Sequence, residues 1–336
     1  MLNPELKLNP KIFNDAGENA CEQLPIRKGF GQGLLKAGEE DKNVVALCAD
    51  LTESTQMHLF KEKFPERFVE IGVAEQNLVT VASGMSAMGK IPFCSSYAMF
   101  SPGRNWEQIR TTIAYNDRKV IVVGSHAGIS VGPDGGTHQA LEDIGLMRML
   151  PNMDVISPCD AIEAKKATMQ LAKSKRPAYL RLAREKTPII TTEETPFEIG
   201  KAQTYWLPDV GLAEVGIIVT GGLTHRALLA AKELEAEGIK IKVLNLSSIK
   251  PIDKEALIAL AKETKCIVTV EEHQIAGGMG SAVSEVLSAN FPVVIEFIGV
   301  KDLFGQSGTP DELIEHYGMG KDAIKEAVRK VFKRKT

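Results

Sequence analysis

The sequence contains no apolar run that approaches the roughly 18–20 residues of a membrane-spanning helix. Its first residues also lack the apolar core of a signal peptide, so we expect a cytoplasmic protein without membrane association. The five cysteines are far apart and form no CxxC pair, and the six histidines show no metal-ligand spacing. We therefore expect reduced thiols instead of a zinc site or a disulfide framework. A net charge of −3 gives no basic surface for nucleic acid.

The composition is that of an ordinary globular protein. With 336 residues, of which 44% are apolar and 25% charged, the chain suffices for one large or two medium domains. Short apolar runs alternate with helical patterns, which predicts two doubly wound α/β domains with mainly parallel sheets. We expect an N-terminal extension (1–24), a first domain (25–190) and a second domain (191–336), with a linker and a short strand within 187–203. The predicted strands span 44–50, 68–72, 91–97, 119–127, 153–159, 177–183, 215–221, 239–246, 266–273 and 293–300.

Polar side chains collect where the predicted strands of the first domain end. In a doubly wound sheet, ligands bind at the carboxyl ends of the strands. A structural core would not need acids, imidazoles, aromatic rings and guanidinium groups together at this rim, so the sequence predicts a ligand site there. The residues concerned are Asp50, Thr52, Ser54, Glu75, Tyr97, Phe100, His126, Asp134, His138, Arg181 and Arg184.

Glu75 follows a predicted strand in EIGVAEQN (70–77) and precedes a segment with helical periodicity. On a helix it shares a face with an apolar stripe, where burial of a carboxylate is costly unless another group pairs with it or it takes up a proton. Position alone supports two interpretations: an acid near the positive end of the helix dipole, or an acid held for chemistry. The stripe consists of Leu78, Val79, Ala82, Met85 and Gly89, whereas Gln76, Asn77, Thr80 and Ser83 fall on other sides.

A glycine-rich segment, SHAGISVGPDGGTHQALED (125–143), follows an apolar strand. Its glycines let the backbone take unusual angles and let a ligand approach closely. His126 lies at the strand end, and His138 lies where we expect a helix to start, with Thr137 as a possible cap. Imidazole carries protons near neutral pH, although each histidine alone is equally explained as a hydrogen-bonded loop residue. No GxGxxG or P-loop motif follows any strand.

Three motifs carry a resemblance to a known family. GVAEQN (72–77) with the residues up to Phe100, the segment 125–164 and CADLTEST (48–55) closely resemble the carboxyl-terminal half of transketolase. The resemblance extends from about Pro25 to the end of the chain and implies a pyrimidine-binding domain followed by the transketolase C-terminal domain. Related thiamine-diphosphate enzymes differ in the glycine-rich loop: deoxyxylulose-phosphate synthase has a histidine pair there, and the β subunits of 2-oxoacid dehydrogenases have another pattern.

The resemblance implies a cofactor, thiamine diphosphate, and a role for Glu75. In this family the matching glutamate shares its proton with a ring nitrogen of the aminopyrimidine, which activates the thiazolium carbon. Burial of Glu75 on an apolar stripe agrees with proton sharing, because burial disfavours the free carboxylate. Phe100 matches the aromatic that stacks on the aminopyrimidine, Tyr97 a second ring of the pocket, and Asp50 an acid near the cofactor, although plain core packing also explains the two rings. Gly103 departs from the family pattern, which has a third aromatic there.

Other positions match groups that handle a phosphorylated sugar. His138 is expected near the donor carbonyl, His126 nearer the phosphate, and Asp134 at the hydroxyl next to the carbonyl. Arginine suits a terminal phosphate because its planar fork binds oxygens in pairs. A surface ion pair, with Glu185 or Asp160, is the alternative interpretation of Arg184. The phosphate-holding set comprises Arg27, Ser54 and Arg184.

A missing motif bears on the partners of this chain. Transketolases hold the cofactor diphosphate through magnesium bound by a GDG…N segment of the amino-terminal domain, and no GDG occurs in this sequence. The resemblance therefore implies a split enzyme, in which an N-terminal transketolase subunit supplies the diphosphate and magnesium site and this chain supplies no metal ligands. It further implies a two-plus-two heterotetramer with the cofactor between chains.

The implied reaction is transfer of a two-carbon ketol unit between sugar phosphates, for example from xylulose 5-phosphate to ribose 5-phosphate in the pentose phosphate pathway. One alternative is another thiamine-diphosphate ketol transferase or decarboxylase subunit, acting on modified sugars or like deoxyxylulose-phosphate synthase. Another is a non-catalytic regulatory paralogue, against which the presence of Glu75 with His126, Asp134 and His138 argues. In the second domain, His273 and the following GGMG (277–280) suit either an anion-binding turn or close helix packing, and we favour packing. We interpret His225 as structural.

Overall fold

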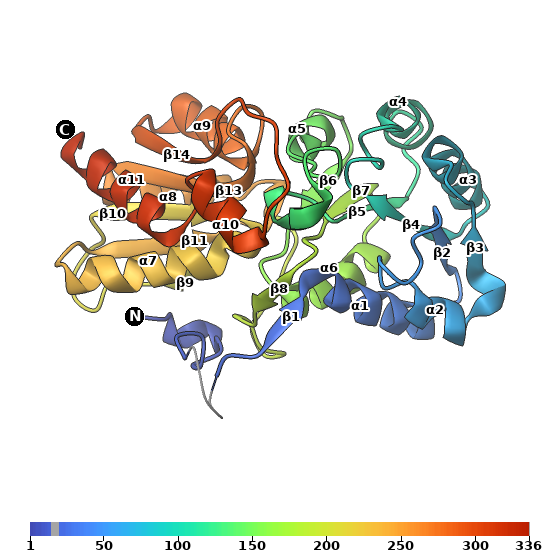
Figure 1. Ribbon diagram of the computed structural model, residues 1–336, viewed down its shortest axis with the longest axis horizontal. Helices are drawn as coiled ribbons and strands as arrows, with labels where there is room; N and C mark the ends of the chain where they lie inside the picture. The colour runs from blue at the N-terminus through green and yellow to red at the C-terminus, as the bar shows by residue number, and fades with distance from the viewer. Residues whose placement is uncertain (15–19, 336) are drawn as a thin grey trace.

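The chain forms two α/β units, each built on its own sheet (Figure 1). The computed structural model describes residues 1–14 and 20–335. In Figure 1, a seven-stranded sheet is built mainly from the blue-to-green half of the chain, and a five-stranded sheet is built from the yellow-to-red half. A separate antiparallel pair joins β1 (Gln23–Pro25) to β8 (Lys186–Pro188), so the start and the end of the first unit lie side by side.

The seven-stranded sheet places the carboxyl ends of its parallel strands at one edge. Buried β-branched and apolar residues fill its central strands, as expected for a sheet covered on both faces. Every neighbouring pair is parallel except the outermost pair of β12 and β6. The order is β12 (Ser248–Lys250), β6 (Asp154–Ile156), β7 (Ala178–Arg181), β5 (Ile121–Ser125), β4 (Ile91–Tyr97), β2 (Val44–Cys48) and β3 (Phe68–Glu70).

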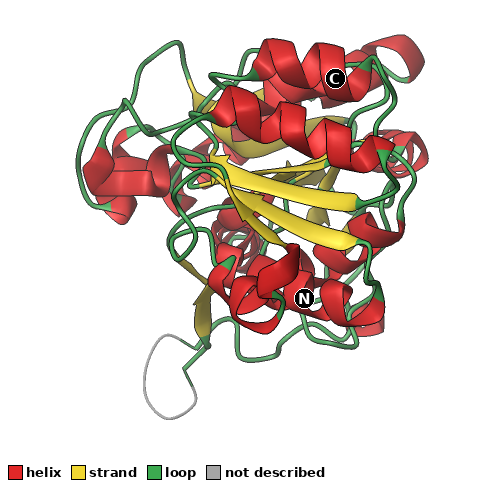
Figure 2. Ribbon diagram, turned by 90° about the vertical axis from the view of Figure 1, so that its right-hand side faces the viewer, coloured by secondary structure: helices red, strands yellow, loops and turns green. Residues whose placement is uncertain are grey.

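Helices cover both faces of this sheet (Figures 1 and 2). On one face, α1 (Ile26–Glu40), α2 (His58–Lys63) and α6 (Ala161–Lys173) enclose a core that includes Phe30 and Phe93. Asp160 caps α6 by accepting a hydrogen bond from the backbone of Glu163, which fixes where that helix begins. The other face is covered by α3 (Glu75–Ala87), α4 (Trp106–Gln108), the π-helical turn Ile109–Ala114 and α5 (Asp143–Arg148).

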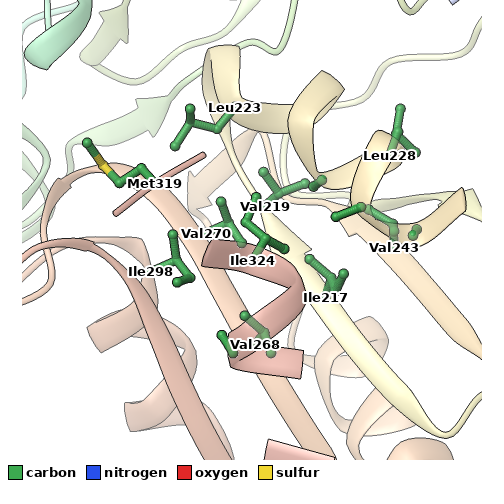
Figure 3. Close-up of a cluster of buried hydrophobic side chains, with 14 of the residues drawn as sticks. Ile217, Val219, Leu223, Leu228, Val243, Val268, Val270, Ile298, Met319 and Ile324 are labelled. Atoms are coloured by element: carbon green, nitrogen blue, oxygen red, sulfur yellow. The ribbon is translucent and has the colours of Figure 1, made fainter. Parts of the chain in front are cut away.

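The five-stranded sheet is parallel apart from its edge strand β9. Figure 3 shows side chains of β10, β13 and α11 gathered in the core on one of its faces. The strand order is β14 (Val294–Val300), β13 (Cys266–Gln274), β10 (Val215–Val219), β11 (Ile241–Asn245) and β9 (Gln203–Trp206). Its helices are α7 (Thr224–Ala236), α8 (Lys254–Thr264), α9 (Met279–Asn290), α10 (Pro310–His316) and α11 (Lys321–Lys333).

All the predicted strands are present, and two further features tie the units together. After β11 the chain crosses over, and β12 pairs antiparallel with β6 at the edge of the first sheet. One hydrophobic cluster also runs from α3 and α5 into α8 and α9. The two units therefore share an apolar interior, although we predicted two separate domains on either side of the linker.

The N-terminal extension packs on the second unit of this same chain. The backbone N–H of Asn3 donates to the Tyr205 carbonyl at 2.9 Å, and Ile12 is buried in the core of the five-stranded sheet. His225 bonds the carbonyl oxygen of Ile12 through Nε2 at 2.7 Å, which agrees with the structural role that we expected for it. All five cysteines are free thiols, and four of them are buried. Among the described residues, we find no helix that is both long and apolar enough to cross a membrane.

Candidate active site

Glu75 is a buried acid at the first position of α3, with only 2% of its side chain exposed. Its Oε2 accepts a hydrogen bond from Arg104 Nη1 at 2.6 Å, and its Oε1 accepts one from Ser96 Oγ at 3.3 Å. Its backbone carbonyl accepts from Asn105 Nδ2 at 2.8 Å. The guanidinium group supplies the counter-charge that a buried carboxylate requires. These contacts therefore fix the orientation of the Glu75 carboxylate, and Arg104 balances its charge.

Three positions of the predicted apolar stripe on α3 are buried as expected, but the last predicted position is not part of the helix. Leu78, Val79 and Ala82 are buried beside Glu75. The helix ends at Ala87, so Gly89 lies beyond it and is exposed. Ser83, which we expected on another side, is buried because its hydroxyl donates to the Thr112 carbonyl of the π-helical turn at 2.6 Å. That partner is distant in sequence, so periodicity could not reveal it.

Two aromatic rings and two imidazoles meet at the ends of β4 and β5. The rings of Tyr97 and His126 are stacked with centroids 3.8 Å apart, and those of Tyr97 and Phe100 lie 6.3 Å apart at 19°. His138 meets the ring of Phe100 edge-on at 5.4 Å. Four residues that the sequence placed separately at strand ends therefore form one cluster, called here the ring cluster: Tyr97, Phe100, His126 and His138.

His126 is held in a setting that disfavours its charged form. Burial of the imidazole, together with the positive charges of Arg27 and Arg184 and the neighbouring His138, lowers the pKa of His126 to about 3. Its Nδ1 lies 2.9 Å from Ser125 Oγ and its Nε2 lies 3.3 Å from Arg27 Nη1. The guanidinium can only donate, so Nε2 accepts and the proton resides on Nδ1. His126 is consequently a neutral imidazole at physiological pH.

This setting gives a testable pH dependence of stability. Histidine in the unfolded chain binds a proton near pH 6.5, whereas folded His126 binds one only near pH 3, so the folded state loses stability as pH falls through that window. As the pH falls below about 6, the free energy of unfolding of the wild type should decrease more steeply than that of His126→Asn, by about 1.4 kcal/mol per pH unit. Asparagine tolerates the positive φ of 56° at this position. The measurement is urea unfolding of both proteins at a series of pH values.

The control for this prediction is His316→Asn, because His316 is exposed on α10. Its stability should follow the wild-type pH dependence. An identical pH dependence for His126→Asn and His316→Asn would show that His126 does not remain neutral in the folded protein.

The predicted phosphate-binding residues lie around the ring cluster. Arg27 Nη1 donates to the backbone carbonyl of Ser54 at 2.5 Å, so Ser54 contributes its main chain. Arg184 Nη1 donates to the Val131 carbonyl at 2.7 Å and lies 3.4 Å from Glu185. The ion pair with Glu185 that we considered for Arg184 is therefore present. Burial and the charge of Arg184 both lower the pKa of Arg27, which places the two cations within electrostatic reach.

The two predicted aspartates of the site, Asp50 and Asp134, are both exposed. Asp134 ends the short 3₁₀ helix Ile129–Asp134 within the glycine-rich loop. Asp50 follows β2 with a positive φ of 59°, and its backbone N–H donates to Glu70 Oε1 at 2.8 Å. The Glu70 carboxylate also accepts from Thr52, so Glu70 organises the turn after β2.

The expectation that a helix starts at His138 is wrong. The chain after Gly136 instead returns to β5, where Ala140 bridges to Ala127 and its carbonyl accepts from Gly128. Residues 136–138 form a turn, in which the His138 N–H donates to the Gly135 carbonyl at 3.0 Å, and α5 begins only at Asp143. Thr137 does not cap a helix; its hydroxyl lies 2.9 Å from His138 Nδ1 and so orients that ring.

A side chain from the second unit holds the glycine-rich loop in position. Glu272, at the end of β13, is buried, and its Oε1 accepts a hydrogen bond from the backbone N–H of Ser130 at 2.5 Å. Gly128 has a φ of 92° and lies so close to the Glu272 carboxylate that a side chain there would collide with it. The position of the loop therefore depends on Glu272, 142 positions after its partner Ser130, which the sequence patterns did not identify.

Arg181, which we placed at the rim of the site, belongs to a buried ion pair. Its Nε and Nη2 donate to the two oxygens of Asp143 at 2.7 and 3.2 Å. Burial opposes ionisation of Asp143, but Arg181, His273 and Tyr179 outweigh it and lower the pKa of that carboxyl. Arg181 also donates to the Glu272 carbonyl at 2.8 Å, so the pair joins the two units.

The GGMG segment holds an internal carboxylate. Glu271 Oε2 and Oε1 accept from the backbone N–H groups of Met279 and Gly280 at 2.6 and 2.8 Å, at the start of α9. Burial is the chief cause that raises the pKa of Glu271 to about 7. His273 bonds the Gln274 carbonyl through Nδ1 at 2.7 Å. These contacts agree with the packing interpretation of this segment.

Arg104 is the site residue that the sequence did not reveal. Its guanidinium carbon lies 4.9 Å from the centroid of the Phe100 ring, in addition to its bond with Glu75. It follows Gly103, where a side chain would collide with the carbonyl oxygen of Met99, so this loop cannot present an aromatic residue at that position. The only sequence signal was the unusual SPGRN (101–105) that replaces the expected aromatic.

The residues around Glu75 fit an aminopyrimidine. A planar nitrogen-containing group, the Arg104 guanidinium, already hydrogen-bonds the buried carboxylate and lies over Phe100. A flat nitrogen heterocycle would use the same two contacts. Among residues 1–14 and 20–335, no cluster of three or more His, Cys, Asp or Glu side chains could hold a metal ion.

The fold is that of an α/β protein in which a buried carboxylate, the ring cluster and two arginines lie near the carboxyl ends of parallel strands. The sequence matches the transketolase pyrimidine-binding domain over residues 22–189 and the transketolase C-terminal domain over residues 205–324. The chain belongs to the transketolase family, and its two units are the pyrimidine-binding and C-terminal domains of that family.

Three relatives are similar over nearly the whole chain. A putative transketolase C-terminal section of Methanocaldococcus jannaschii is 42% identical over 92% of this chain and 96% of its own length. A 6-deoxy-6-sulfo-D-fructose transketolase subunit of Clostridium sp. (strain MSTE9) is 38% identical over 96% of this chain and 99% of its own. A solved structure, described as a split gene transketolase in an inactive β4 tetramer, has a TM-score of 0.86 at 42% identity and covers 93% of this chain and 100% of its own.

Proposed function

We propose that this chain is one subunit of a thiamine-diphosphate-dependent transketolase that moves a two-carbon ketol unit between sugar phosphates in the cytoplasm. The observation that carries the proposal is the buried carboxylate of Glu75, which shares the Arg104 guanidinium with the ring of Phe100 near the carboxyl ends of parallel strands. The buried carboxylates of Asp143 and Glu271 are held by groups that are themselves buried, whereas Arg104, the partner of Glu75, is half-exposed and can make way for a ligand. When bound, the cofactor supplies the carbon nucleophile that attacks the donor carbonyl.

In this proposal Glu75 holds the proton at the ring nitrogen of the aminopyrimidine. Proton sharing requires a carboxylate that is shielded from water and fixed in direction. The contacts from Ser96 and Asn105 supply the direction, and burial supplies the shielding. Phe100 stacks on the aminopyrimidine and Tyr97 forms the adjoining wall, while Asp50 lies on the cofactor side of the sheet edge.

In this proposal, the imidazoles and arginines of the site bind the sugar phosphate. Because His126 is neutral, it orients hydroxyl or phosphate oxygens by hydrogen bonds and does not act as a cation. His138, half-buried with its ring fixed by Thr137, is placed to donate to the oxygen of the donor carbonyl. Asp134 is exposed and accepts from the neighbouring hydroxyl. Arg27, Ser54 and Arg184 bind the terminal phosphate, and the Ser54 carbonyl orients the Arg27 guanidinium.

The proposal includes a partner chain. The sequence has no GDG motif, and the relatives are named as a C-terminal section and as a split gene product. We infer that an N-terminal transketolase subunit holds the cofactor diphosphate through magnesium and that the chains assemble as a two-plus-two heterotetramer. The β4 tetramer of the split gene relative is described as inactive, which supports the need for a second kind of chain.

A second candidate differs only in the donor. The subunit from Clostridium is named for a sulfonated sugar, and an arginine-lined rim accepts a sulfonate as well as a phosphate. The same chemistry and the same residues apply to both candidates, so the assay must compare donors.

The test is a coupled assay of the co-purified pair with xylulose 5-phosphate and ribose 5-phosphate, run beside 6-deoxy-6-sulfofructose as donor. We expect glyceraldehyde 3-phosphate to form with the first donor. A kcat/KM that is larger by tenfold or more (about 1.4 kcal/mol) for the sulfonated donor would favour the second candidate. Absence of product with every ketose donor, from a pair that binds the cofactor, would leave the non-catalytic paralogue.

A further inference from the structure

Arg104 makes both contacts that the proposed cofactor ring requires. Its Nη1 donates to Glu75 Oε2 at 2.6 Å, and its guanidinium lies 4.9 Å from the centre of the Phe100 ring. Its side chain is 49% exposed, whereas that of Glu75 is 2% exposed. In the isolated chain, the Arg104 guanidinium therefore reaches inward from the surface, hydrogen-bonds the buried Glu75 carboxylate and lies over the Phe100 ring.

The backbone at this position is anchored, so only the side chain is free to move. The Asn105 amide donates to the Glu75 carbonyl at 2.8 Å, which ties the loop to α3, and to Ser101 Oγ at 3.1 Å, which closes the loop across Arg104. A half-exposed arginine side chain turns about its own bonds on a nanosecond scale. Release of the carboxylate thus needs no rearrangement of the loop.

We propose that Arg104 is a positioning residue that stands in for the aminopyrimidine, pairs with buried Glu75 in the unassembled chain, and leaves when the cofactor arrives. This inference rests on the proposed function. Its physical basis is competition: the guanidinium and the heterocycle need the same carboxylate oxygen and the same aromatic ring. Without Arg104, Glu75 retains only the 3.3 Å bond from Ser96 to its side chain.

The first test uses the unassembled full chain and does not depend on activity. Arg104→Met should lower the Tm by about 2–5 °C, because the buried carboxylate loses its counter-charge. Arg104→Lys, which keeps the charge, should stay near the wild type. The double variant Glu75→Gln/Arg104→Met should recover most of the loss. Arg110→Met, at an exposed position of the adjacent π-helical turn, is the matched control and should leave the Tm unchanged.

The second test is thiamine diphosphate binding to the assembled pair, measured by calorimetry with magnesium present. Arg104→Met should bind the cofactor about tenfold more tightly than the wild type, since no resident group has to be displaced. Equal or weaker binding by Arg104→Met, beside measurable binding by the wild type, would overturn the inference alone. A wild-type pair that binds no cofactor would overturn the proposed function and the inference with it.

Discussion

Glu75→Gln in the assembled pair is expected to lower the rate of ketol transfer by about 10³-fold, within the range observed when a positioned acid or base is removed. Glutamine keeps the size of the side chain but cannot accept and return a proton. Its amide can still occupy the place beside Ser96, so the fold should survive. The rate is measured with saturating cofactor and both sugar phosphates, and Glu75→Ala should be at least equally impaired.

Two controls separate loss of proton sharing from loss of structure. Glu62→Gln changes an exposed acid on α2 and should keep the wild-type rate. The Tm of Glu75→Gln should lie close to that of the wild type or above it, because an amide is less costly to bury than a carboxylate. A Glu75→Gln pair that retains more than about a tenth of the wild-type kcat would remove the proton-sharing role.

Much of this fold can be predicted because its signals are local. Each core strand is a short apolar run, and the strand residues 91–97 are predicted to the residue. The carboxyl ends of parallel strands necessarily meet at one edge, so the ring cluster could be anticipated from Tyr97, His126 and His138 without knowing their distances. Burial of Glu75 also followed from helical spacing alone.

The features that escaped prediction depend on partners far along the chain. Glu272 reaches the loop of His126 from the second sheet, and β12 joins the first sheet from the second unit. We expected Arg181 at the rim of the site because it ends a strand, but its side chain is buried and donates to Asp143. Arg104 lies 29 residues after Glu75, and no periodic pattern links an exposed loop arginine to a buried helix-start acid.

The same reasoning predicts that purified chain alone shows no detectable ketol transfer and that activity appears only with an N-terminal transketolase subunit. The chain offers a site for the ring of the cofactor, but its sequence has no GDG motif for the magnesium diphosphate. Without contacts to the diphosphate and the metal, the isolated chain holds only the ring of the cofactor, so we expect it to bind the cofactor at least about 10²-fold more weakly than the pair does.

Titration of a fixed amount of this chain with the partner, at saturating cofactor and magnesium, measures that dependence. Activity should rise linearly and reach a plateau at one partner per chain, because each composite site needs one of each. The Glu75→Gln chain should form the same complex by gel filtration without restoring activity, which separates assembly from chemistry. Turnover by the chain alone at more than about a hundredth of the plateau rate would show that both halves of the cofactor are bound within this single polypeptide.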